Sequence, residues 1–261
     1  MSIAKDMTIL ITSCRKYSDV LHVFEQLFLK YWSDCPYDIV LSTDFKVESY
    51  SLDYSNVVAS GDLPNGTRDF HALKTITTPY ILWMPEDFWI TSNVSNGDMQ
   101  RFLEYAKEYD AGHLRLNKLS WEKADVFDNN DELFAVRQGA YRLTHGGIWE
   151  TRLLMPLLEK YDNTWDFERK SSFDIIACDR LILAARLYKF PVVPVVWRGR
   201  LIRESERIMN AHGIDVGSMS RRVESNYEFL REKLKGVIFR AYPNLVTKTL
   251  NTLRLGHKRK S

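Results

Sequence analysis

The chain has 261 residues, of which 45% are hydrophobic and 27% are charged, and a formal net charge of +2. This composition suits a globular protein with one substantial core, and the near-neutral charge, without a nucleic-acid-reading motif, argues against a nucleic-acid partner. Cys14, Cys35 and Cys178 lack the close pairing of a zinc site or a redox dithiol, which fits a reducing compartment. The apolar run near the N-terminus is too short for a signal peptide or a membrane span, so we expect a cytoplasmic protein.

The first part of the chain alternates strand and helix patterns. Met7–Thr12 is a short β-branched apolar run, and the apolar spacing after it predicts a helix within residues 14–32. The next expected elements are strands at Tyr37–Asp44 and Ser55–Asp62, a helix at Arg68–Thr78 and a strand at Tyr80–Ile90. This alternation indicates an α/β fold with a mainly parallel sheet flanked by helices.

The remaining part has a more mixed pattern. Its expected elements are a helix at 97–109, a strand at 111–117, an antiparallel strand pair within 133–144, a helix after Gly146 and Gly147, a helix within 172–188 and a proline-broken edge strand at 190–197. After Gly213 the sequence becomes charged and helical. We therefore expect one domain at 1–222, with a small antiparallel element, and a helical C-terminal appendage at 223–261.

The apolar run YILWMPEDFWI is interrupted by two adjacent carboxylates, Glu86 and Asp87. Ligands of open α/β sheets bind beyond the carboxyl ends of the strands, and paired carboxylates there can hold a divalent cation such as Mn²⁺ or Mg²⁺. Such a cation neutralises the charge that develops on a diphosphate leaving group. The alternative is that the two acids cap a helix or lie on a solvated turn.

Four segments carry a family resemblance: TSCRKY, TTPYILWMPEDFWI, NTWDFERKSSFD and VVWRGRLI. They resemble segments of bacterial glycosyltransferases of the GT-A type that build capsule polysaccharides and the O-antigen of lipopolysaccharide. The resemblance implies a GT-A-like fold and the transfer of a sugar from a nucleotide-sugar donor, UDP-linked in the first instance, to a glycan hydroxyl with inversion. Where the family has a DDY or DxD motif this chain has PEDFW, so Asp87 is the expected direct metal ligand beside Glu86. A metal-independent enzyme that uses basic side chains on the diphosphate stays open.

The resemblance also implies roles for single residues in the donor site. Thr12, Ser13 and Tyr17 would border the base and ribose, and Asp44 would hydrogen-bond to them. Basic candidates for the diphosphate are Arg15, Lys16, Arg68, Arg198 and Arg200. Helix packing for Tyr17 and simple solvation for the arginines are the alternatives.

An inverting transfer needs a carboxylate that takes the proton of the acceptor hydroxyl. The segment TWDFERKSSFD offers Asp166, Glu168 and Asp174, and the resemblance favours Glu168; a surface ion pair is the alternative. On the acceptor side, Trp149 and Trp165 are candidates for stacking on sugars, or for core packing, and His145 for a polar contact, or for a turn.

The sequence from Phe239 onward mixes apolar and basic residues, a pattern typical of peripheral contact with anionic membrane lipids. Contact at the inner face of the membrane would suit a lipid-linked glycan acceptor, whereas packing on the domain or on a second protomer explains the same pattern.

Two other functions stay open. A nucleotidyltransferase would carry a glycine-rich loop after the first strand, which TSCRKYS lacks, and a non-catalytic carbohydrate-binding or membrane-docking scaffold would keep the fold without the chemistry.

Overall fold

The computed structural model describes residues 6–46, 49–118, 125–136, 146–163, 166–167, 171, 174–175, 180–187, 190–231 and 234. The chain divides into two compact units, residues 1–194 and 195–261, and each is described by itself. The sequence places the start of the appendage at residue 223, whereas the second unit of the structure begins at Val195, directly after the proline-broken edge strand.

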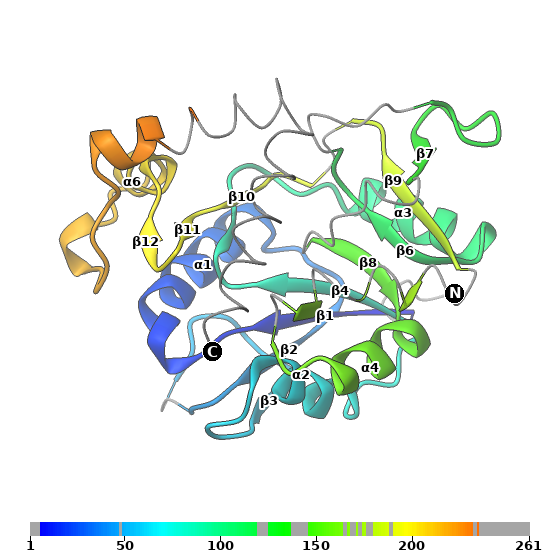
Figure 1. The fold of residues 1–261 in the computed structure, drawn as a ribbon, viewed down its shortest axis with the longest axis horizontal. Helices are drawn as coiled ribbons and strands as arrows, with labels where there is room; N and C mark the ends of the chain where they lie inside the picture. The colour runs from blue at the N-terminus through cyan, green and yellow to red at the C-terminus, as the bar shows by residue number, and fades with distance from the viewer. Residues whose placement is uncertain are drawn as a thin grey trace, which may run out of the picture. The chain divides into compact units, whose positions relative to one another are not determined.

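The first unit is built on an eight-stranded sheet in the order β3-β2-β1-β4-β8-β6-β9-β7 (Figure 1). Its strands are β1 (Met7–Thr12), β2 (Asp38–Thr43), β3 (Asn56–Ala59), β4 (Tyr80–Pro85), β6 (Ala111–Arg115), β7 (Leu133–Ala135), β8 (Gly147–Glu150) and β9 (Leu181–Ala185). Strands β3, β2, β1 and β4 are parallel to one another, and β6 is parallel to β9. Strand β8 runs antiparallel between β4 and β6, and β7 runs antiparallel to β9. The α/β fold with a mainly parallel sheet, expected from the sequence, is therefore confirmed.

Helices cover both faces of this sheet. They are α1 (Ser18–Tyr31), preceded by the short helix η2 (Arg15–Tyr17), α2 (Asn65–Leu73), α3 (Asn96–Glu108) and α4 (Thr151–Lys160). Helices α2 and α4 lie side by side on one face, and α1 and α3 lie on the other (Figure 1). The second pair is linked where Trp32, which follows α1, donates a 2.7 Å hydrogen bond from Nε1 to the side chain of Asn96.

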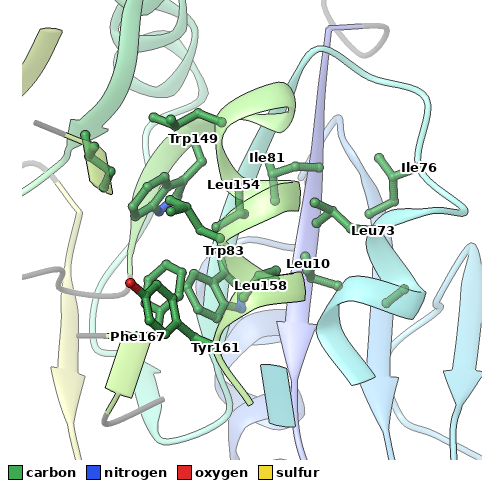
Figure 2. Close-up of a cluster of buried hydrophobic side chains, with 14 of the residues drawn as sticks. Leu10, Leu73, Ile76, Ile81, Trp83, Trp149, Leu154, Leu158, Tyr161 and Phe167 are labelled. Atoms are coloured by element: carbon green, nitrogen blue, oxygen red, sulfur yellow. The ribbon is translucent and has the colours of Figure 1, made fainter. Parts of the chain in front are cut away.

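The core between the sheet and the α2–α4 pair is centred on two tryptophans, Trp83 of β4 and Trp149 of β8 (Figure 2). Their ring centroids lie 6.5 Å apart, and Phe167 packs edge-on against Trp83 at 5.0 Å. These large aromatic rings come from segments distant in the sequence, so their burial fixes the antiparallel strand β8 beside β4.

The expected strand at Tyr80–Ile90 is two strands. The chain turns at Glu86 and Asp87, leaves the main sheet, and continues as β5 (Phe88–Ile90), which pairs antiparallel with β10 (Val192–Pro194). The carboxylate pair therefore lies in the turn that connects the eight-stranded sheet to the two-stranded sheet of β5 and β10.

Two sequence predictions in the second half of this unit are wrong. The segment 147–150, expected as a turn into a helix, is the strand β8, and helix α4 begins only at Thr151. Residues 181–185, expected within a helix, form β9. The run LILAA is almost wholly buried, and a short apolar run without alternation does not distinguish a buried strand from a buried helix.

The second unit begins with a hairpin of β11 (Val196–Trp197) and β12 (Arg200–Leu201), followed by α6 (Arg203–Ala211) and the short helix η3 (Val216–Ser218). Glu228 accepts hydrogen bonds from both Arg200 and Arg222, so Arg200 has a structural anion partner within this unit. Residues 239–261, for which the sequence predicts membrane contact, lie outside the described residues. Among the helices that the structure describes, none is long and apolar enough to cross a membrane.

Candidate functional site

Three parallel strands end at the same level of the sheet. Thr12 at the end of β1 lies opposite Ser42 of β2 and Pro85 of β4. Beyond these positions the ends stay hydrogen-bonded, since the amide of Ser13 donates to the carbonyl of Ser42 at 2.9 Å and the amide of Glu86 donates to that of Thr12 at 3.1 Å. The loops that follow β1, β2 and β4 are therefore held together at one edge, where open α/β sheets bind their ligands.

Asp44 follows β2 and is tied to the loop after β1. Its Oδ1 accepts a 2.6 Å hydrogen bond from the backbone amide of Arg15, and its Oδ2 lies 3.7 Å from Nη1 of Arg68. The Arg15 side chain itself is exposed, with its guanidinium 5.3 Å from the ring centroid of Phe45. Asp44 thus contacts two other residues that the sequence predicts for the donor site, Arg15 and Arg68. Its contact with Arg15 is made by the backbone of Arg15.

Arg68 is a buried cation beneath these loops. Its side chain is 4% exposed and donates to the carbonyl oxygens of Leu63 at 3.1 Å and Ser13 at 3.4 Å, and also to the side chain of Asn65. Because the guanidinium is fixed by backbone carbonyls, it provides a positive charge of defined position. Such a charge suits the recognition of phosphate groups.

Glu86 brings a second carboxylate to this edge. Its side chain is buried, Asp87 beside it is half-buried, and both have interactions within the protein. Burial raises the pKa of the Cys14 thiol, and the negative charges of Glu86 and Asp44 raise it further, whereas Arg68 lowers it. Cys14 therefore lies within electrostatic reach of all three charged groups, which the strand ends bring together.

A metal held by the Glu86 and Asp87 pair would need further ligands, such as water or substrate oxygens. Within the described part of the chain, no group of three or more histidine, cysteine, aspartate or glutamate side chains is arranged to hold an ion. Two carboxylates completed by water and substrate phosphates suit Mg²⁺, which usually keeps several waters. The metal role of this pair stays a prediction.

A functional candidate that the sequence reasoning missed is Asp69, in the first turns of α2. Its side chain is buried, and Oδ2 accepts a 2.9 Å hydrogen bond from the hydroxyl of Thr12. The Thr12 hydroxyl in turn accepts a 2.9 Å hydrogen bond from Nε1 of Trp83. The Thr12 side chain is thus engaged inside the protein, which does not fit the expectation that it borders a base or ribose. It links β1, β4 and α2 beneath the site.

Trp149 is a core residue. Its side chain is 1% exposed, and its ring stacks on that of His113 with the centroids 3.8 Å apart and the planes 12° apart. A sugar has no exposed indole face to stack on, so the expected acceptor contact does not fit this position. The packing alternative describes Trp149 correctly.

The segment proposed to carry the catalytic base is described in part. Phe167 is buried against Trp83, and the carboxylate of Asp174 is held by Lys160 and by the hydroxyl of Tyr161. The hydrogen bond from Lys160 lowers the pKa of Asp174, which makes Asp174 a poor general base.

Other predicted residues cannot be assigned to the site from the structure. Glu168, Trp165 and His145 lie outside the described residues. Tyr17 is half-buried at the start of α1, and its donor role stays a prediction. Arg198 belongs to the second unit, where it is exposed in the β11–β12 turn with a φ of 53°. Its role toward a diphosphate also stays a prediction.

No protein-family model and no curated protein sequence matches this chain. Among solved structures it is similar to TarS of S. aureus, with 13% identity and a TM-score of 0.50, over 79% of this chain and 38% of TarS. It is also similar to 2-C-methyl-D-erythritol 4-phosphate cytidylyltransferase from Thermus thermophilus. The identity is 14% and the TM-score 0.46, over 72% of this chain and 93% of the other. The chain spans about two fifths of the length of TarS. The likeness to TarS shows the fold alone, an α/β fold that resembles that of GT-A glycosyltransferases.

Proposed function

We propose that this chain is a glycosyltransferase that moves a sugar from a nucleotide-sugar donor to a hydroxyl of a bacterial surface glycan, with inversion. The observation that carries the proposal is the convergence of Asp44, Arg68 and Glu86 around Cys14 at the carboxyl ends of three parallel strands. Two carboxylates and one fixed cation at this edge match the needs of a ligand that combines hydroxyl groups with a diphosphate.

In the proposed division of roles, Asp44 hydrogen-bonds to the base or ribose and Arg68 binds the diphosphate. Asp87, with Glu86, holds Mn²⁺ or Mg²⁺ against the same diphosphate, where the cation would neutralise the leaving group. A metal-independent reaction would place this work on the arginines alone. A UDP-linked sugar is the first donor to test.

Glu168 is the proposed base that accepts the proton of the attacking hydroxyl. Two observations support this choice among the carboxylates of the segment. Phe167, the residue before Glu168, is anchored on Trp83 of β4, the strand that leads to Glu86 and Asp87. Asp174 is held in an ion pair with Lys160, whose charge favours the deprotonated form and weakens Asp174 as a base.

The proposed acceptor is a glycan of the capsule or O-antigen kind, carried on a lipid. The basic, amphipathic sequence from Phe239 onward supports peripheral contact with the inner face of the membrane.

A nucleotidyltransferase is disfavoured because the loop TSCRKYS after β1 contains no glycine for the close approach of a triphosphate. A non-catalytic scaffold is separated from an enzyme by experiment.

The first experiment is a thermal-shift panel of UDP, GDP, CMP and dTDP compounds, each with manganese and with a chelator. A ligand at about 100 times its Kd adds roughly 2.7 kcal/mol to the free energy of unfolding, which is readily measured. Stabilisation by one nucleotide only with manganese supports the cation role of Asp87 and Glu86, and stabilisation that ignores the chelator assigns the diphosphate to the arginines. No response to any nucleotide contradicts the proposal.

Substitutions in the base segment then separate catalysis from binding. Glu168→Gln is expected to lower kcat by at least about 100-fold, the usual contribution of a general base, while the donor Kd stays unchanged. Asp166→Asn, two residues earlier in the same segment, is the matched control and is expected to keep near-normal turnover. Normal transfer by Glu168→Gln would rule out Glu168 as the base.

A further inference from the structure

Asp69 is a buried carboxylate directly under the strand-end site. It is 1% exposed, it follows Arg68 in α2, and it reaches Thr12 at the end of β1 through a 2.9 Å hydrogen bond to Oδ2. Burial raises the pKa of the carboxyl group by more than the side chains of Ser42, Thr12 and Trp83 lower it through hydrogen bonding. A carboxylate this deeply buried is costly to keep ionised.

The groups that face Asp69 are mostly neutral. From β1, β2 and β4 they are Thr12, Ser42 and Trp83, and Arg68 is the charged group that acts on the carboxylate. The other titratable groups of the site, Cys14, Asp44 and Glu86, surround Arg68 from the loops after the strands. On α2 itself the remaining titratable group is His71. The titratable side chains of α4, Arg152, Glu159 and Lys160, are exposed, and the hydroxyl of Tyr161, which follows α4, is bound to Asp174.

We propose that Asp69 tunes the strand-end site for anions: its carboxylate offsets the charge of Arg68, so that a nucleotide sugar binds more tightly when Asp69 carries a proton. The inference rests on the proposed function, because it assumes that the diphosphate binds at Arg68. Asp69 is buried and does not touch the ligand. It is therefore a positioning residue, which acts through Arg68 and through Thr12.

Elementary electrostatics gives the direction of the effect. A diphosphate brought to Arg68 adds negative charge near a carboxylate, which favours the neutral form of that carboxylate. Burial already raises the pKa of Asp69 to about 6, so the change of charge takes place at accessible pH. Because coupling is reciprocal, a ligand that raises the pKa of Asp69 by one unit binds about tenfold more tightly to the protonated protein than to the ionised protein.

The test is isothermal titration calorimetry of the full chain with UDP-glucose, GDP-mannose and dTDP-glucose, whose bridging diphosphates have no group that titrates near neutral pH. Each titration is made with chelator present, at about pH 5.5 and about pH 7.5. These values lie on either side of the pKa of about 6 that burial gives the carboxyl group of Asp69. Two buffers with different ionisation enthalpies report the protons taken up on binding. The wild-type protein is expected to take up protons and, for a one-unit rise in the pKa of Asp69 on binding, to bind roughly sixfold more tightly at the lower pH.

Asp69→Asn keeps the shape and removes the charge. We expect this variant to bind with the low-pH affinity of the wild type at both pH values and to take up no proton, whereas the matched variant His71→Gln is expected to behave as the wild type does. The inference is overturned if the affinity of Asp69→Asn depends on pH as that of the wild type does, or if His71→Gln takes up no proton on binding. Either result leaves the proposed function standing. If none of the three nucleotide sugars binds, either with chelator or in a repeat of the titration with manganese, the proposed function is overturned, and the inference with it.

The wild-type measurement keeps the inference falsifiable if Asp69→Asn does not fold. Nucleotide-sugar binding without any proton uptake by the wild-type protein contradicts a role for Asp69 in anion affinity, whatever the variant does. Proton uptake that persists in His71→Gln supports the inference without the Asp69 variant.

Discussion

The backbone amide of Arg15 donates a 2.6 Å hydrogen bond to Oδ1 of Asp44, so the loop after β1 holds the end of β2 through the main chain. The Arg15 guanidinium is exposed and lies over Phe45 instead. The sequence resemblance implies a donor-binding role for both residues and assigns the role of Arg15 to its side chain. In the structure the backbone of Arg15 fixes Asp44, and the role of its guanidinium is a separate question.

Two substitutions at Arg15 separate these contributions. Arg15→Ala keeps the amide and is expected to change the Kd of the bound nucleotide sugar by less than about threefold, as is usual for an exposed charge. Arg15→Pro removes the amide, and proline is tolerated at the first position of a helix such as η2. Loss of a hydrogen bond to a charged group costs about 1.5–3 kcal/mol, so we expect Arg15→Pro to weaken binding by at least about tenfold.

The measurement is a titration of both variants with the nucleotide sugar that stabilises the wild-type protein. Their thermal unfolding is compared first, so that a general loss of structure is not mistaken for loss of the site. A larger loss of affinity in Arg15→Ala than in Arg15→Pro would assign the donor contact to the guanidinium after all.

Trp149 is expected to matter for stability and not for sugar binding. Its ring is buried between His113, Trp83 and Phe167, so Trp149→Ala should lower the free energy of unfolding by about 3–5 kcal/mol, the usual cost of removing a buried aromatic ring. Urea denaturation measures this loss. The milder Trp149→Phe should keep the acceptor KM, and a raised KM with unchanged stability would restore the stacking role predicted from the sequence.

Gly66 allows α2 to approach the end of α4. A Cβ atom at this position would lie 1.8 Å from the carbonyl oxygen of Tyr161, so Gly66→Ala forces the two helices apart and should destabilise the protein by about 3 kcal/mol. Gly97 in α3 is the matched control, because a Cβ there meets nothing nearer than 3.8 Å. Gly97→Ala is expected to change stability by less than about 1 kcal/mol, measured by the same urea titration. Equal effects at the two positions would contradict the proposed close packing.

The first half of the fold was predictable because its patterns are strong. Strand β1 coincides with the expected Met7–Thr12, and α1 lies within the expected helical segment. Strands β8 and β9 were not predictable in the same way, since GIWE and LILAA are short runs whose strand character depends on neighbours far along the chain. Local pattern does not contain that information.

The sequence predicted the carboxylates at the strand ends of the candidate site, but it did not predict the buried carboxylate beneath them. The strand ends point to Asp44, Glu86 and Asp87, because polar residues after apolar runs are visible in one sequence, and the roles of these acids stay predictions. Asp69 was missed although a signal exists: it shares the apolar face of α2 with Ala72 and Leu73, at positions i, i+3 and i+4. A carboxylate on an apolar helix face is a candidate for a buried functional acid.

That buried acid makes the stability of the protein depend on pH in a defined direction. The carboxyl pKa of Asp69 is raised by burial from its ordinary 3.8 to about 6 in the folded protein. Between these values the folded protein binds a proton that the unfolded chain does not bind, so the free energy of unfolding falls as the pH rises through this window. The difference of about two units corresponds to roughly 3 kcal/mol, which is lost in full above the folded-state pKa.

Asp69→Asn removes this loss because its amide stays neutral. We expect the variant to be more stable than the wild type at neutral pH, by up to about 3 kcal/mol, and the difference to shrink toward zero as the pH falls to about 4. Urea denaturation over a pH series measures it, and Asp62→Asn, an exposed aspartate just before α2, is the control that should keep the wild-type pH profile. If Asp69→Asn were instead less stable by the same amount at every pH, the hydrogen bond from Thr12 to the ionised carboxylate would outweigh the cost of its burial, and Asp69 would remain charged in the working protein.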